Sequence, residues 1–177
     1  MQFKSGSSVS LNGYSIVSVG GAITIENGIN INPDVRLMTG SSIKGLYPSI
    51  GLAVQEASNG DRVVASGVSK TCEDDLGVPG GMTLELEGCN MEFDSGVWLK
   101  VLGALKADNS TFTRPGGSSN WKGIRFYDSA VDSSCVIENS TISYAGYGVY
   151  TFLSNPGIRN NRITNCTRGE ELLVGAW

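Results

Sequence analysis

The sequence predicts an all-β solenoid, a fold in which short strands stack coil upon coil along one axis. Three observations lead to this prediction. Of the 177 residues, 24 are Gly and 40% are hydrophobic, but only 17% are charged, which suits strands and turns better than disorder or a helical bundle. Apolar and polar residues alternate in short runs, as half-buried strands require. Similar phrases also recur at intervals of 21 to 30 residues, which is typical of stacked repeats.

Residues 1–45 are predicted to form short strands that precede the regular coils. Apolar residues alternate with polar ones in Ile29–Ile31 and in Val35–Leu37, so each run has one face for a core. We expect this segment to form another coil or a flap that caps the end of the solenoid.

One short helix is predicted over residues 49–58. Four apolar residues have the i, i+3, i+4, i+7 spacing of an amphipathic helix: Ile50, Ala53, Val54 and Ala57. Ser49 is suited to cap the first turn, and Asn59-Gly60 follows as a stop signal.

The remaining coils, over residues 46–166, repeat two strand phrases. The first phrase places Asn between two apolar residues: Ala107–Phe112, Ile137–Ile142 and Ile158–Ile163. The second phrase begins with Gly: Gly96–Leu99, Gly123–Phe126 and Gly148–Thr151. The loops vary in length whereas the phrases persist, so insertions are expected to point outward between stacked strands. A β-sandwich is the alternative, but Asn-Gly hairpin turns do not account for the repeated phrases.

Three stretches carry a family resemblance: the helix, Gly-Asp step and following strand in Ser49–Gly67, the Trp-x-Gly-Ile phrase in Asn120–Phe126, and the paired Asn phrases. Together they resemble the right-handed parallel β-helix, or pectate-lyase-like, superfamily. The resemblance implies a single domain of six or seven coils. Lyases, hydrolases, adhesins and proteins of unassigned function share this fold, so the resemblance implies no particular activity.

Residues 167–177 depart from the repeat. Their apolar side chains are suited to cap the last coil: Leu172, Leu173, Val174 and Trp177. The alternative is that a longer β-helix was cut at this point, which would leave an open coil end able to self-associate through unpaired strand edges.

Composition and charge exclude several classes of function. The chain contains no His, which excludes Ser-His-Asp and Cys-His catalysis and His-ligated metals. Its net charge of −4 leaves no basic face for a nucleic acid. No apolar run approaches the roughly 18 residues of a membrane span. Residues 1–6 lack an apolar segment, so we expect that any signal peptide has been removed and that the protein is extracellular or at the cell surface.

The four cysteines are spaced too widely for a zinc site, and we expect no metal or cofactor outside the lyase hypothesis below. Their spacing leaves open disulfides between Cys72 and Cys89 or between Cys135 and Cys166, as well as free thiols.

Three asparagines begin glycosylation sequons in form: Asn109, Asn139 and Asn165. They coincide with turn positions of the repeat, where Asn tolerates a left-handed backbone. We therefore interpret them as turn residues.

An aromatic and cationic strip is the candidate binding site. Because side chains alternate across a strand, residues between the inward ones point outward in columns. The predicted columns are Trp98, Arg125 and Tyr150, and then Lys100, Tyr127 and Phe152. Aromatic faces stack on sugar rings, and an Arg between aromatics gains cation–π contact or pairs with a uronate carboxylate. The predicted carbohydrate-binding residues are Trp98, Lys100, Arg125, Tyr127 and Tyr150. The alternative interpretation is that like residues stack there for stability.

The leading hypothesis is thus a non-catalytic β-helix protein that binds polysaccharide through this strip. The second, implied by the resemblance, is a polysaccharide lyase or glycoside hydrolase, with Arg125 as the candidate base and Asp128 and Asp132 assisting. Lyases of this fold hold Ca²⁺ in a carboxylate cluster, whereas the acidic residues here are scattered singly; Glu85 is better explained by an ion pair with Lys106, one coil away. The third hypothesis is a structural segment of a longer adhesin.

Overall fold

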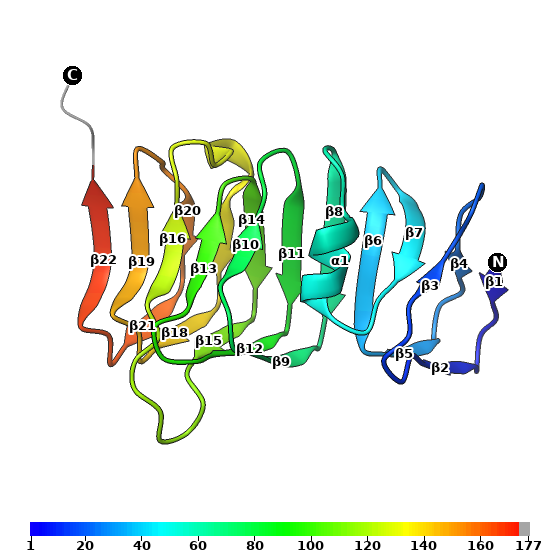
Figure 1. The fold of residues 1–177 in the computed structure, drawn as a ribbon, viewed down its shortest axis with the longest axis horizontal. Coiled ribbons are helices and arrows are strands. Elements are labelled where there is room, and N and C mark those ends of the chain that lie inside the picture. The colour runs from blue at the N-terminus through cyan, green and yellow to red at the C-terminus, as the bar shows by residue number, and fades with distance from the viewer. Residues whose placement is uncertain (174–177) are drawn as a thin grey trace.

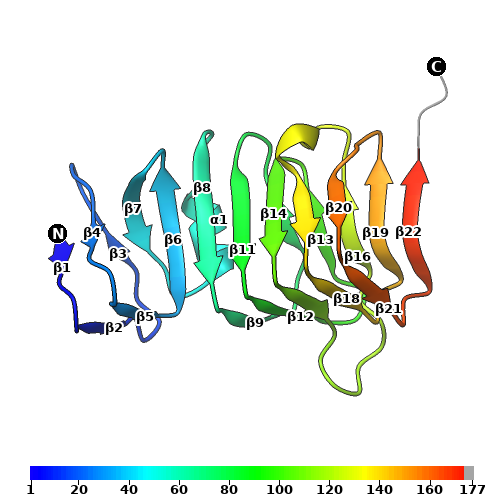
Figure 2. The same cartoon turned by 180° about the vertical axis from the view of Figure 1, so that it is seen from behind.

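The computed structural model describes the backbone of residues 1–173 and the side chains of residues 1–169. Its strands stack along one axis from β1 at the N-terminus to β22 at the opposite end (Figures 1 and 2). The solenoid has about eight turns. The prediction of six or seven coils was too low, because the N-terminal segment also winds into turns before the regular coils begin.

Five coils of three strands form the body of the molecule, and each coil gives one strand to each of three parallel sheets. The first sheet contains β8 (Asp61–Ser66), β11 (Thr83–Glu87), β14 (Ala104–Asp108), β17 (Val136–Glu138) and β20 (Gly157–Arg159). The second contains β9 (Ser69–Cys72), β12 (Asn90–Phe93), β15 (Thr111–Thr113), β18 (Thr141–Ser143) and β21 (Arg162–Thr164). The third contains β10 (Leu76–Val78), β13 (Trp98–Val101), β16 (Gly123–Phe126), β19 (Tyr147–Phe152) and β22 (Arg168–Leu173).

Residues at equivalent positions of the sequence repeat pair with one another in these sheets. Ile137 pairs with Ile158 and Ile142 pairs with Ile163 on adjacent coils, as the matching phrases predicted. One coil earlier, Ala107 pairs with Ile137 and Phe112 pairs with Ile142. The buried side chains therefore stack in columns inside the solenoid, and this stacking accounts for most of the apolar residues.

Asparagine forms turns between successive sheets: Asn109 and Asn139 lie between the first and the second, and Asn165 lies between the second and the third. Asn109, Asn139 and Asn165 have φ values of 49°, 50° and 54°, in the left-handed region that Asn enters more easily than most residues. The interpretation of these residues as turn positions is confirmed.

Helix α1 (Ile50–Glu56) forms where the spacing predicted it. The Leu52 N–H donates to Ser49 Oγ at 3.3 Å, which satisfies one of the unpaired donors of the first turn. Ile50 and Ala53 are buried. The helix packs against β6, β8 and β10 and lies beside the first strand of the third sheet (Figure 1).

The N-terminal segment reverses direction before the regular coils begin. Its strands are β1 (Gln2–Phe3), β2 (Ser8–Ser10), β3 (Ile16–Val17), β4 (Thr24–Ile25), β5 (Asn30–Asn32), β6 (Asp34–Thr39) and β7 (Ser42–Leu46). β1 and β2 pair parallel with β4 and β5, but β6 pairs antiparallel with both β7 and β8. The first sheet thus continues beyond β8 into β6, β7 and β3 with antiparallel pairing, and its parallel stacking begins at β8.

At the other end, the stack continues beyond the predicted last coil at residue 166. Strand β22 pairs parallel with β19, so residues 168–173 extend the third sheet. Val174 and Trp177, which the sequence suggested for a cap, lie outside the described residues.

All four cysteines are free thiols, so neither of the disulfides that the spacing left open is present. Burial raises the pKa of the Cys72 thiol to about 11. Cys89 and Cys135 are also buried, and their pKa values are raised by the same loss of solvation. Neutral thiols here behave as small apolar side chains of the core.

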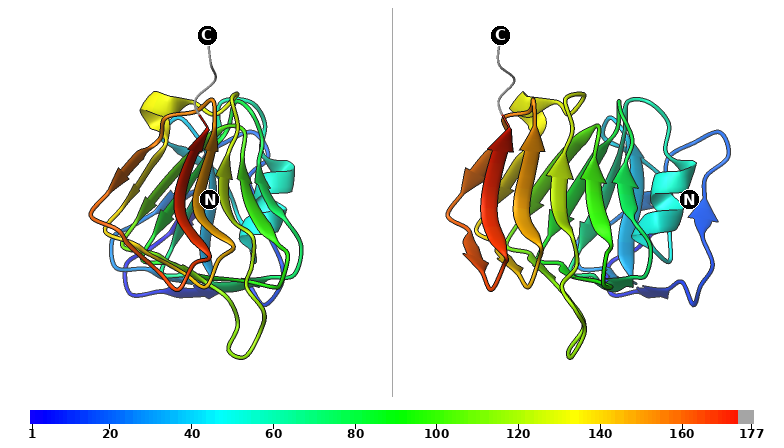
Figure 3. Two further views of the ribbon diagram at one scale, coloured as in Figure 1. Left: turned by 90° about the vertical axis from the view of Figure 1, so that its left-hand side faces the viewer. Right: turned by 60° about the vertical axis from the view of Figure 1, so that its left-hand side comes forward.

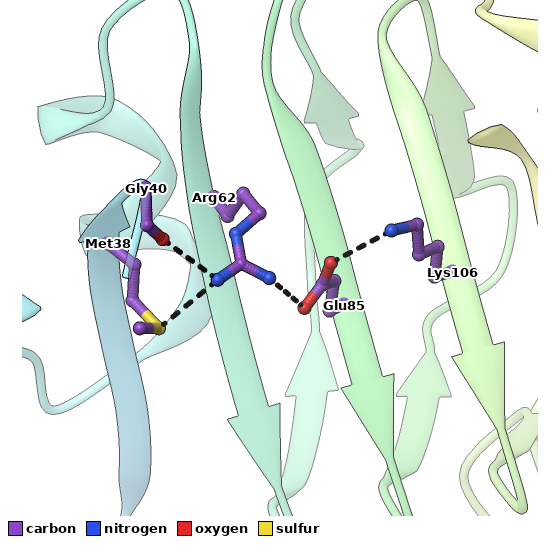
Figure 4. A network of polar contacts seen from close by, with 5 residues as sticks. All are labelled: Met38, Gly40, Arg62, Glu85 and Lys106. Atoms are coloured by element: carbon purple, nitrogen blue, oxygen red, sulfur yellow. Dashed lines mark hydrogen bonds and ion pairs between the residues drawn. The ribbon is translucent and has the colours of Figure 1, made fainter. Parts of the chain in front are cut away.

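Ion pairs cross the outer face of the first sheet. Glu85 lies between Arg62 and Lys106 on the neighbouring strands, with N–O distances of 2.9 and 3.2 Å (Figure 4). The predicted pairing of Glu85 with Lys106 across adjacent coils is confirmed.

Candidate functional site

The candidate site lies on the outer face of the third sheet, where β13, β16 and β19 run side by side (Figure 1). Val97, Ile124 and Val149 are buried, as are the residues two positions later: Leu99, Phe126 and Thr151. The residues between them point outward, as the alternation predicted.

The register of the outward columns differs from the sequence prediction. Trp98 pairs with Gly123, and Lys100 pairs with Arg125, which in turn pairs with Tyr150. The sequence alignment of the Gly phrases was therefore wrong by two residues in β13. The shift preserves which residues point outward, because strand faces alternate with a period of two, but it changes their neighbours.

The guanidinium of Arg125 lies among three aromatic rings. Its Cζ atom is 4.5 Å from the ring centre of Tyr127, 5.1 Å from that of Tyr150 and 6.0 Å from that of Trp98. Arg125 Nε is buried and has no hydrogen-bond partner. Among the side chains of residues 1–169, no carboxylate lies within ion-pair distance of Arg125.

A fourth ring, that of Tyr147, joins this group because of a glycine. Trp98 and Tyr147 are two coils apart, a backbone separation of about 10 Å, yet their rings stack with centroids 5.9 Å apart. Gly123 lies between them and has no side chain to separate the rings. The Tyr147 ring also meets Tyr150 edge-on at 5.3 Å, and the Arg168 guanidinium lies 5.3 Å from its centre.

We call this group of Trp98, Arg125, Tyr127, Tyr147 and Tyr150 the aromatic face. Its aromatic residues are half-buried, so they keep an exposed edge while the sheet holds them in place. Phe152, from the predicted second column, lies beyond it and is exposed.

Lys100 borders the aromatic face, but its charge is paired. Lys100 Nζ lies 2.5 Å from Asp75 Oδ2. The other carboxylate oxygen, Asp75 Oδ1, accepts a hydrogen bond from the Trp98 N–H at 2.8 Å. Asp75 is partly desolvated, which alone would raise its pKa, but the bonds from Lys100 and Trp98 outweigh this and lower the pKa of its carboxyl group.

Comparison with known proteins supports the architecture. A search of curated proteins and a search of solved structures found no significant match to the chain. Residues 95–175 match the family model described as the right handed beta helix region. These residues include β13, β16 and β19, which pair parallel. The chain forms a right-handed parallel β-helix. Proteins with this fold have many different activities. The function of this chain therefore has to be inferred from its candidate site.

Both acidic residues proposed for catalysis lie in the segment between β16 and β17 of the β-helix. Asp132 belongs to the 3₁₀ helix η1 (Asp132–Ser134), and its Oδ1 accepts from Ser154 Oγ and from the Asn155 N–H, both at 2.8 Å. Asp132 therefore ties two loops together. Asp128 is exposed in the loop after β16.

No group of three or more His, Cys, Asp or Glu residues suited to hold a metal occurs in the part of the β-helix that the structure describes. In the same part, no helix is long and apolar enough to cross a membrane.

A groove lies elsewhere, on the first sheet. It has a volume of about 500 Å³ and is lined by charged and small apolar residues, among them Glu85, Lys106 and Glu138. No aromatic residue lines it. The groove offers no ring surface on which a sugar could stack, and we therefore place the candidate site on the flatter aromatic face.

Sequence reasoning missed two residues of the site, Tyr147 and Asp75. Tyr147 immediately precedes the Gly148 phrase, and its place against Trp98 depends on the corrected register. Asp75 belongs to neither of the repeated phrases. The tripeptide Gly146-Tyr147-Gly148, an aromatic between two small residues, is the signal that was available for Tyr147.

Proposed function

We propose that this β-helix binds polysaccharide through the aromatic face, without catalysing a reaction on it. The observation that carries the proposal is the position of Arg125 among half-buried aromatic rings, with no carboxylate of residues 1–169 within ion-pair distance. Aromatic rings supply apolar faces for sugar rings, and a guanidinium supplies paired donors for a carboxylate or hydroxyl oxygen.

The shape of the face also suits a polymer. Trp98, Arg125 and Tyr150 come from three successive coils, so the face extends along the axis of the solenoid. Strands stack about 4.8 Å apart, and a chain of sugars lying across them would meet side chains from each coil in turn. The proposal includes an extracellular or cell-surface location, where such polymers are met.

Two observations favour binding over catalysis at this face. Three aromatic rings make cation–π contacts with the Arg125 guanidinium, an arrangement that suits a residue that binds a carboxylate or hydroxyl oxygen. Asp132, a proposed assisting residue, already accepts two hydrogen bonds that hold loops together. Neither residue is placed as a proton-transfer group would require.

The test is retention by immobilised polysaccharide after removal of one ring. Trp98→Ala and Tyr150→Ala are each expected to weaken binding about fivefold, because each ring contributes about 1 kcal/mol of stacking. Retardation in native gels cast with a panel of acidic and neutral polysaccharides measures this directly. The thermal unfolding midpoint should change little, since both side chains are half-buried at the surface.

Tyr14→Ala provides the matched control. Tyr14 is 78% exposed and lies between β2 and β3, in the N-terminal segment. Its removal should leave retention unchanged. If the wild-type protein is not retarded by any polymer, or if all three variants behave alike, the aromatic face is not a polysaccharide-binding surface.

A further inference from the structure

Asp75 is an acidic residue at the edge of the aromatic face. Its carboxylate contacts both Trp98 and Lys100. One oxygen receives the Trp98 N–H at 2.8 Å. The other receives Lys100 Nζ at 2.5 Å. The side chain is 37% exposed, so both contacts form at the rim of the face rather than inside the core.

The register explains why this loop residue reaches both partners. Strand β10 begins at Leu76, which pairs with Leu99 of β13, and the next residue, Gly77, pairs with Lys100. Asp75 therefore lies opposite Trp98, immediately before the paired strand begins. Gly77 has open space above its Cα atom, so no side chain separates Lys100 from Asp75.

This contact alters the charge that the face presents. Lys100 pairs with Arg125 in the strand register, so two cations occupy adjacent coils. Asp75 neutralises Lys100, whereas Arg125 has no carboxylate partner among the described side chains. Of these two adjacent cations, Asp75 therefore neutralises Lys100, and the face keeps the charge of Arg125.

We propose that Asp75 is a specificity-determining residue, which holds the Trp98 strand in place and masks Lys100 so that the face does not bind strongly to every polyanion. This inference rests on the proposed polysaccharide binding and concerns its selectivity. Asp75 acts through Lys100 and Trp98 and need not touch the sugar itself. Masking one cation limits the general attraction for polyanions and leaves the rings a larger share of the binding energy.

The test is Asp75→Asn, a substitution of equal size that keeps a carbonyl oxygen for the Trp98 N–H but loses the charge. Retardation is measured in gels that contain polygalacturonate or a neutral β-glucan. Removal of the mask should tighten binding to polygalacturonate about two- to fivefold, as expected for one exposed charge pair. Binding to the neutral polymer should be unchanged.

Two control variants distinguish the neutralisation of Lys100 by Asp75 from a general effect of net charge. Asp74→Asn removes the same charge from the adjacent, exposed position, so it reports the effect of net charge alone and should give a smaller change. In the double variant Asp75→Asn/Lys100→Met, binding to polygalacturonate should not be tighter than in wild type, since the lysine whose charge Asp75 neutralises is absent. Added salt should also remove the gain, because it screens exposed charges.

The outcomes are distinguishable. If wild-type protein is retarded but Asp75→Asn binds polygalacturonate no better than wild type or Asp74→Asn, the inference is wrong and polysaccharide binding stands. A loss of binding to both polymers would mean that Asp75 is only a structural support for Trp98, which also overturns the inference. If the wild-type protein is retarded by no polymer, either here or in the full panel, the proposed function and this inference fail together.

Discussion

Asp61 is a buried carboxylate at the junction between the N-terminal segment and the first regular coil. It is 2% exposed and accepts hydrogen bonds from the Thr39 hydroxyl, the Ser58 N–H at 2.9 Å and Lys44 Nζ at 3.0 Å. Burial alone would raise its pKa, but these bonds outweigh burial and lower the pKa of its carboxyl group. The charged form therefore connects three separate segments at one point.

Replacement of Asp61 by Asn is expected to destabilise the protein by about 2–4 kcal/mol, because the buried donors lose a charged acceptor. The folded pKa of Asp61 lies below its unfolded value of about 3.9. Its stabilising effect is thus fully present above that value and is lost as the pH falls through the folded pKa. Thermal melts of wild type and Asp61→Asn should differ most above about pH 5 and converge in stronger acid.

The exposed Asp128 is the control for this prediction, since Asp128→Asn should shift the melting temperature little at any pH. A difference between wild type and Asp61→Asn that grows as the pH falls would contradict the assigned role of the charge.

At the scale of the elements, two glycines set how closely the strands of the third sheet approach. Gly123 has a φ of 127°, and a Cβ atom there would lie 1.8 Å from the carbonyl oxygen of Tyr147. At Gly148 a Cβ atom would lie 2.3 Å from the carbonyl oxygen of Gly169. The close approach at Gly123 is also what lets Tyr147 reach Trp98. The absence of a side chain at Gly123 therefore permits both the close packing of the strands and the contact between Tyr147 and Trp98.

Gly123→Ala is accordingly expected to destabilise the protein by at least about 2 kcal/mol, through backbone strain and the clash with Tyr147. Chemical denaturation followed by tryptophan fluorescence measures this. Gly77→Ala is the matched control, because Gly77 lies in β10 of the same sheet with open space around the position of a Cβ atom. It should change stability by less than about 0.5 kcal/mol. Equal effects of the two substitutions would refute this explanation of the strand spacing.

At the scale of the whole molecule, the apolar side chains of residues 1–169 form two clusters of unequal size. The larger follows the regular coils and includes Trp121, which stacks on Phe93 with ring centres 4.5 Å apart. The smaller contains Leu11, Ile23, Ile31, Ile43 and Leu46 of the N-terminal segment. In a solenoid, each coil is stabilised mainly by its neighbours, so the small cluster and its two-stranded sheets should open more readily than the long parallel stack.

Hydrogen exchange tests this difference. Amides of β1–β5 are expected to exchange at least about tenfold faster than those of β11–β18 in the middle of the stack. Peptide-level mass spectrometry resolves the two regions. Equal protection along the chain would show that the N-terminal segment and the coils unfold as one unit.

The loop between β15 and β16 is the largest departure from the regular coils, projecting from the corner of the solenoid (Figure 3). Arg114 at its start lies 4.7 Å from the ring centre of Tyr144 and donates to Asn120 at 3.3 Å. The repeat accommodates this insertion because a coil needs only its strands to stack, while the connections point into solvent.

Much of the fold could be predicted because stacking imposes a pattern that is visible in the sequence. Successive coils place equivalent residues in one column, so Ile137–Ile142 and Ile158–Ile163 resemble each other, and Asn recurs where the backbone turns left-handed. The short helix followed from its apolar spacing and Ser49. The outward direction of Trp98, Arg125 and Tyr150 followed from strand alternation alone.

The tertiary structure alone decided which of these residues meet. Side-chain alternation is unchanged by a shift of two residues, so the sequence could not reveal that Trp98 faces Gly123 or that Arg125 lies beside Lys100. The contact of Tyr147 with Trp98 spans two coils, and the contact of Asp75 with Lys100 depends on where β10 begins to pair. Periodicity determines the direction of a side chain, whereas its neighbours depend on the register between strands distant in the sequence.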